Sequence, residues 1–176
     1  QTLSGTPHLS IPVIAVTGTH GKSTVIALLD SIFAVAGKHC GTISGVGCYD
    51  GMSHSAGVEV PGAPELASRL ERMVAAGCTH ALVEVSSEAL AQASFAGVAF
   101  DAVCITNVSD AHLDLHNSVV SYRNLKRRIL DSLDPAGVAI FNADDPVSIK
   151  WLAHVDGPVL TFGTREQAEV SAYVIE

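Results

Sequence analysis

A glycine-rich segment near the start of the chain carries the residue types that bind nucleotide phosphates; it reads Thr17-Gly18-Thr19-His20-Gly21-Lys22-Ser23-Thr24. Glycines allow successive backbone N–H groups to point into one concavity, and the N-terminus of a following helix adds positive potential there. Lys22 is placed to reach terminal phosphates, and the Ser23 hydroxyl to ligate Mg²⁺. Val16 stands where the general phosphate-loop pattern has its first glycine, which predicts a shorter variant of that loop. The alternative is an ordinary glycine-rich turn between a strand and a helix.

A carboxylate lies near the end of a second apolar run. Glu84 follows His80-Ala-Leu-Val in the sequence. If this run forms a strand beside the phosphate loop, Glu84 is placed to hold Mg²⁺ directly or through water. The alternative is a solvated acid at a strand end.

Four potential metal ligands alternate with apolar residues further along the chain: Asp110, His112, Asp114 and His116. In an extended segment all four would lie on one side. A spacing of two residues is not a standard one for zinc. The alternative is a half-exposed strand or loop with its polar residues turned outward.

Lys126 falls at the edge of the apolar face of a predicted helix, four residues after Tyr122 and four before Leu130. A lysine close to a core has a lowered pKa, which makes its amine reactive. The alternative is a surface lysine that packs its aliphatic stem and keeps its charge in water.

Short apolar runs alternate with segments of helical periodicity, and this pattern predicts the elements that position these residues. Strands are expected at 11–17, 38–43, 80–85, 101–106, 137–141, 159–162 and 170–175, and helices at 23–36, 64–76, 87–96, 119–133 and 144–153. Residues 44–62 are expected to form a loop or hairpin. The alternation predicts a three-layer α/β fold of the phosphate-loop type, with a mainly parallel sheet covered by helices on both faces. Ligands of such sheets bind outside the carboxyl ends of the strands.

The composition bounds the classes of partner. The 176 residues suggest one domain, and the net charge of −8 argues against a nucleic-acid partner or an anionic membrane surface. No apolar stretch approaches the ~20 residues of a membrane span, and no signal peptide is visible. None of the four cysteines forms a Cys-x-x-Cys pair, so we expect reduced structural thiols in a cytoplasmic protein.

An ordered set of motifs resembles the central ATP-binding domain of the Mur ligases, the ATP-dependent amino-acid ligases of peptidoglycan precursor synthesis. The set comprises the phosphate loop, Gly41-Thr42-Ile43, Glu84-Val-Ser-Ser, Asn107-x-x-x-x-His112-Leu-Asp-x-His116, Tyr122-x-x-x-Lys126 and Asn142-Ala-Asp-Asp145. It spans residues 12–146, most of the chain. Within the family it is most similar to the ligases that add meso-diaminopimelate or lysine to UDP-N-acetylmuramoyl-dipeptide.

The resemblance implies a reaction. ATP phosphorylates the terminal carboxylate of a UDP-MurNAc-peptide to an acyl phosphate, and the amine of an amino acid attacks it to give an amide, ADP and phosphate. It also implies residue roles. Gly18 through Thr24 and Asn107 would contact the nucleotide. Ser23 and Glu84 would bind one Mg²⁺, and His112 and a carbamylated Lys126 would bind a second. Thr42, Ser86 and Gln92 would contact the acceptor. Lys22, His112 and Lys126 would be the catalytic residues.

Several positions depart from the family pattern. Ala111 stands before His112 where Asp is usual, Glu88-Ala89 replaces His-Gly, Ser94 replaces a basic residue that contacts the UDP-sugar, and Val58-Glu-Val-Pro61 replaces a Thr-Thr-Pro motif. The acceptor is therefore the part of the interpretation that the motifs support least. Two alternatives stay open: a related ligase with a polyglutamate-type or cyanophycin-type acceptor, and a nucleotide-binding pseudoenzyme.

The resemblance also predicts the domain organisation. Residues 1–176 would form the central domain, ending before the segment that grips adenine in the family. The UDP-binding amino-terminal domain and the amino-acid-binding carboxy-terminal domain are expected to be missing, in keeping with Gln1 at the start of the chain. The isolated domain is then expected to be inactive in ligation.

Overall fold

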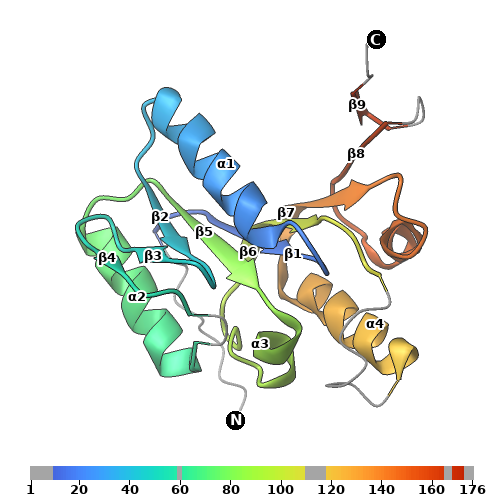
Figure 1. Ribbon diagram of the computed structural model, residues 1–176, viewed down its shortest axis with the longest axis horizontal. Helices are drawn as coiled ribbons and strands as arrows, with labels where there is room; N and C mark the ends of the chain where they lie inside the picture. The colour runs from blue at the N-terminus through green and yellow to red at the C-terminus, as the bar shows by residue number, and fades with distance from the viewer. Residues whose placement is uncertain (1–9, 59–60, 110–117, 165–167, 173–176) are drawn as a thin grey trace.

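A computed structural model describes residues 10–58, 61–109, 118–164 and 168–172 and shows one nine-stranded sheet with the strand order β4-β3-β2-β5-β1-β6-β7-β8-β9 (Figure 1). The strands are β1 Val13–Thr17, β2 Cys40–Ile43, β3 Cys48–Tyr49, β4 His54–Ser55, β5 His80–Val85, β6 Phe100–Ile105, β7 Leu133–Asn142, β8 Val159–Gly163 and β9 Val170–Ser171. All neighbouring pairs from β2 to β9 in this order are parallel. The β2–β3 and β3–β4 pairs are antiparallel, and β3 and β4 form a hairpin at one edge of the sheet.

Helices cover both faces of the sheet, as predicted. They are α1 Lys22–Val35, α2 Ala63–Ala75, α3 Ser87–Ala91 and α4 Val119–Arg127, with 3₁₀ segments η1 Arg128–Ser132 and η2 Ser148–His154. Alternate residues of a strand point to opposite faces. Accordingly Val13 and Ala15 of β1 join the core beneath α2, α3 and α4, whereas Val16 packs with Ile26 of α1 on the other face (Figure 1).

The strand register brings distant segments together at the carboxyl edge. Thr17, the last residue of β1, lies opposite Val85 of β5 on one side and Ile105 of β6 on the other. The residues that follow Thr17, Val85 and Ile105 therefore meet at one end of the sheet, and Glu84 lies one residue before the end of β5. This is the edge at which the alternation of strands and helices predicts a ligand.

The predicted helix over 119–133 is wrong in its second half. The α-helix ends at Arg127, a 3₁₀ turn follows, and β7 already begins at Leu133. Pro135 disfavours helical geometry in the residue before it and supplies no N–H to a ladder. The β6–β7 register is accordingly irregular, passing from Phe100–Leu133 directly to Ala102–Val138.

Other elements differ in extent. The predicted helix over 144–153 is a 3₁₀ segment, and the predicted helix over 87–96 ends at Ala91, shortly before Ala93 adopts a left-handed φ of 52°. The hairpin expected within 44–62 is confirmed as β3–β4. All four cysteines are free thiols. Among the described residues, none of the helices has the length and apolarity needed to cross a membrane.

Candidate nucleotide site

The phosphate loop connects the end of β1 to the start of α1. Its two glycines have left-handed φ values, 152° at Gly18 and 84° at Gly21, which disfavour other residues. A Cβ at Gly18 would also overlap the Thr106 hydroxyl. Gly21 is the N-cap of α1, and no side chain caps this helix. The N–H groups of its first turn are therefore left for a ligand, as an anion site requires.

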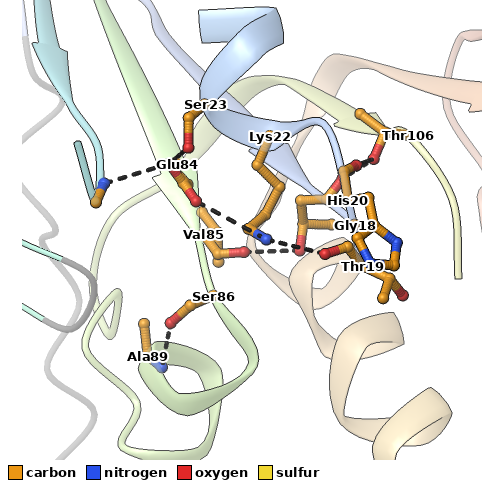
Figure 2. Close-up of polar contacts among 12 residues, drawn as sticks. Gly18, Thr19, His20, Lys22, Ser23, Glu84, Val85, Ser86, Ala89 and Thr106 are labelled. Carbon is orange, nitrogen blue, oxygen red and sulfur yellow. Dashed lines mark hydrogen bonds and ion pairs between the residues drawn. The ribbon is translucent and has the colours of Figure 1, made fainter. Parts of the chain in front are cut away.

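Residues that follow β6 hold the loop in this shape. The Asn107 side chain brackets the His20 backbone: its Oδ1 accepts from the His20 N–H at 3.0 Å, and its Nδ2 donates to the His20 carbonyl at 3.1 Å. The Thr106 hydroxyl donates to the same carbonyl at 2.7 Å (Figure 2). The N–H of Thr19 donates to the Asn107 carbonyl at 2.9 Å. Asn107, predicted as a nucleotide contact, thus supports the loop.

Glu84 lies between the first two side chains of α1. Its Oε2 accepts from the Ser23 hydroxyl at 2.7 Å and from the Gly45 N–H at 3.3 Å, and its Oε1 lies 3.8 Å from Lys22 Nζ (Figure 2). The Glu84 residue is 9% exposed. A carboxylate beside a hydroxyl, next to the loop, is the oxygen donor set that Mg²⁺ prefers in nucleotide sites. These residues therefore fit the metal predicted from the sequence.

Lys126 is 1% exposed, so it lies in the interior and not at the edge of an apolar face. Its Nζ donates to the Gly18 carbonyl at 2.9 Å and lies 5.1 Å from the centroid of the Tyr122 ring. Burial lowers the pKa of Lys126 to about 7, repulsion from Lys22 adds to this shift, and Glu88 and Glu84 oppose it. A neutral amine at this pKa is nucleophilic at ordinary pH, which a reaction with carbon dioxide requires.

One pocket joins these groups at the carboxyl edge of the sheet. It encloses about 450 Å³, partly open to solvent, and is lined by Gly18, Lys22, Glu84, Ser86, Ser87, Glu88, Tyr122 and Lys126. Two lysines and two glutamates thus face the same space. The structure brings together Gly18, Lys22, Glu84, Ser86 and Lys126 of the predicted site. Ser23 adjoins it through Glu84.

Thr19, His20, Gly21 and Asn107 belong to the loop and its support and do not line this pocket, and Thr42, Gln92 and Thr24 also lie outside its lining. Thr42 is half-buried in β2, Gln92 is exposed at the C-terminus of α3, and Thr24 is exposed in α1. His112 lies outside the described residues, as do Asp110, Asp114 and His116. In the described part of the chain, His, Cys, Asp and Glu form no group of three or more that could hold a metal. In this part of the chain, the Ser23 hydroxyl and the Glu84 carboxylate are oxygen donors beside the loop that could bind a metal.

Sequence reasoning missed the supporting role of Thr106 and noted Tyr122 and Glu88 only as motif members or departures. Thr106 directly follows β6, and the position after a parallel strand is the signal that could have identified it. Ser86 caps α3 by accepting from the Ala89 N–H at 3.1 Å, which orients the turn that carries Glu88 (Figure 2).

Comparison with known proteins gives consistent matches. The family model of the Mur ligase middle domain matches residues 16–176. A UDP-N-acetylmuramoyl-L-alanyl-D-glutamate–2,6-diaminopimelate ligase of Parabacteroides distasonis is 34% identical over 173 residues, covering 98% of this chain and 36% of the relative. A UDP-N-acetylmuramyl-tripeptide synthetase of Roseiflexus sp. is 34% identical over 185 residues, covering 96% of this chain and 36% of the relative. The chain thus spans about a third of the length of these relatives.

Solved structures of Mur ligases also superpose on this chain. A UDP-N-acetylmuramoyl-L-alanyl-D-glutamate–2,6-diaminopimelate ligase superposes with a TM-score of 0.76 at 26% identity, covering 90% of this chain and 33% of the other. MurF ligase from Thermotoga maritima in complex with ADP superposes with a TM-score of 0.68 at 19% identity, covering 92% of this chain and 34% of the other, and supports the fold alone.

Proposed function

Because the chain belongs to the Mur ligase family, as a middle domain of that family, we propose that it is the Mg-ATP-binding unit of an ATP-dependent amide ligase of peptidoglycan precursor synthesis. The observation that carries the proposal is the convergence of Lys22, Glu84 and Lys126 on one pocket beside a glycine-rich loop that leaves the N-terminus of α1 uncapped.

The loop and its lysine bind the triphosphate. Backbone N–H groups at the start of α1 surround the phosphates, and Lys22 contacts the terminal two. Ser23 and Glu84 would hold one Mg²⁺, and Lys126, as a carbamate, would hold a second together with His112. When bound, Mg²⁺ neutralises charge on the phosphate that is transferred. Positioned positive charge does most of the work in phosphoryl transfer, because the transition state needs little covalent help from the protein.

The carboxylate acceptor receives the phosphate in this pocket. An acceptor oxygen attacks the terminal phosphorus of ATP and ADP leaves, forming an acyl phosphate. The amine of an amino acid then attacks the acyl carbon, inorganic phosphate leaves, and an amide results. Lys22 stabilises the negative charge that develops in the first step. The chain's residues therefore bind and orient the reactants, and none serves as a covalent nucleophile.

The acceptor is proposed to be a UDP-MurNAc-peptide, contacted by Thr42, Ser86 and Gln92. Ser86 lines the pocket, and the relatives are named for ligases that act on UDP-N-acetylmuramoyl-L-alanyl-D-glutamate. We also propose that the chain is the middle of three domains, with the UDP-binding and amino-acid-binding domains supplied by flanking sequence.

The function is tested in two steps. Isothermal titration of the 176-residue protein with Mg²⁺ and a non-hydrolysable ATP analogue is expected to show one nucleotide site, and absence of binding would contradict the proposal. The three-domain enzyme is then assayed for ADP release with UDP-MurNAc-dipeptide and a panel of amino acids. Release only with polyglutamate-type or cyanophycin-type acceptors would reassign the acceptor, and nucleotide binding without turnover on any acceptor would indicate a pseudoenzyme.

A further inference from the structure

The hydroxyl of Thr19 is a buried junction between three segments. Thr19 is 4% exposed and Tyr122, which approaches it from α4, is 1% exposed. The two hydroxyl oxygens lie 3.1 Å apart, and the Thr19 hydroxyl also accepts from the Ser109 N–H at 3.0 Å. The phosphate loop, the segment after β6 and helix α4 therefore meet at one oxygen atom.

Helix α4 contacts the loop at a second point. Lys126, one turn after Tyr122, donates to the carbonyl of Gly18, the residue directly before Thr19. Two consecutive loop residues are thus bound by two side chains from the same face of one helix. Since rotation about the bonds between them would break one contact or the other, this part of the loop is restrained before any ligand arrives.

We propose that Tyr122 is a positioning residue of the nucleotide site, which acts through the Thr19 hydroxyl to hold the phosphate loop in the shape that receives phosphates. The effect of Tyr122 on the shape of the loop does not depend on the proposed function, whereas its effect on nucleotide affinity rests on that function. Pre-organised binding groups lose less conformational entropy when the ligand binds. The tyrosine is therefore expected to contribute to affinity without itself being required to touch the nucleotide.

The hydroxyl can be separated from the ring in an experiment. Tyr122→Phe keeps the buried ring, with its contacts to the core and to Lys126, and removes one oxygen. Burial raises the pKa of Tyr122, so the hydroxyl keeps its proton at neutral pH and can donate. Loss of one such hydrogen bond is expected to weaken nucleotide binding about threefold to tenfold.

Hydrogen–deuterium exchange of the nucleotide-free protein gives the first readout. Tyr122→Phe and Thr19→Val are each expected to accelerate amide exchange in residues 17–24, and Thr19→Ser, which keeps the hydroxyl, to recover most of the lost protection. Tyr49→Phe is the matched control, because its hydroxyl donates to the Gly51 carbonyl at 2.9 Å in the β3–β4 hairpin. Unchanged loop exchange in Tyr122→Phe would overturn the proposal.

A double-mutant cycle on the affinity for the ATP analogue gives the second readout. If Tyr122 acts through Thr19, the variant with both Tyr122→Phe and Thr19→Val binds about as weakly as either single variant. Fully additive losses would contradict that route. If the unmutated protein fails to bind the analogue, the proposed function is wrong, while the exchange experiment still decides the role of Tyr122.

Discussion

The amine of Lys126 donates a hydrogen bond of 2.9 Å to the carbonyl of Gly18, although the two residues are 108 positions apart in the chain. This contact joins the last turn of α4 to the first residue of the phosphate loop. It places an amine from one helix beside the N-terminus of another, at the edge where β1, β5 and β6 end. The predictions below concern the groups gathered around it.

Lys22→Ala is expected to weaken binding of Mg-ATP by at least about tenfold, because it removes a charge-assisted contact to the phosphates. Titration calorimetry of the nucleotide measures the change. Lys38→Ala is the control, since Lys38 is an exposed lysine between α1 and β2. Equal nucleotide affinity in Lys22→Ala and Lys38→Ala would show that Lys22 does not contact the phosphates.

Glu84→Gln is expected to raise the Mg²⁺ concentration needed for half-maximal nucleotide binding by about tenfold or more, because an amide is a poorer ligand than a carboxylate. Affinity is measured across a series of Mg²⁺ concentrations. Glu71→Gln, at an exposed position of α2, should leave the Mg²⁺ dependence unchanged. A metal dependence that is the same in both variants would exclude Glu84 as a ligand.

The pKa of Lys126, lowered from 10.5 to about 7, predicts a pH dependence of stability. Between pH 7 and pH 10.5 the unfolded chain holds the proton that the folded protein has released, so this lysine makes the free energy of unfolding rise with pH. The slope is at most ~1.4 kcal/mol per pH unit. The stability that deprotonation of Lys126 provides above pH 10.5 is lost as the pH falls toward 7.

Urea unfolding of the unmutated protein and of Lys126→Met at several pH values isolates that contribution, since the cysteines titrate in both proteins. The difference in free energy between the two is expected to change in favour of the unmutated protein as the pH rises. A constant difference across this range would show that Lys126 keeps an ordinary pKa.

The amine of Lys126 is expected to form a carbamate in bicarbonate buffer. Incubation with ¹³C-bicarbonate should produce a protein carbamate signal in the ¹³C NMR spectrum, and Lys126→Arg should abolish it because guanidinium stays protonated. Lys38→Arg is the matched control and should keep the signal. A signal that persists in Lys126→Arg would assign the modification to another amine.

Gly18→Ala is expected to destabilise the loop and abolish most nucleotide binding. The new Cβ would overlap the Thr106 hydroxyl, and the φ of 152° is unfavourable for alanine. Such overpacking with backbone strain costs about 1–3 kcal/mol. Thermal unfolding and nucleotide titration measure both effects. Gly47→Ala, where a Cβ meets no atom within 4 Å, should change neither.

The local sequence determined the phosphate loop, because its glycines, lysine and serine are adjacent in the chain and their geometry depends on one strand–helix turn. It also predicted the parallel α/β fold. Strands that alternate with amphipathic helices can bury the apolar surfaces of both in few ways other than a parallel sheet covered by helices. Glu84 was predicted at the site because it lies near the end of a buried strand, and parallel strands end at one edge of the sheet.

Tertiary structure alone decided which side chains share the pocket. The burial of Lys126, its contact with Gly18 and the junction between Thr19 and Tyr122 depend on how α4 docks, and helical periodicity placed Lys126 only at the edge of a face. The end of α4 at Arg127 and the early start of β7 likewise follow from pairing with β6. Local preferences are weak compared with packing and strand pairing, so contacts across more than a hundred residues emerge only when the sheet has formed.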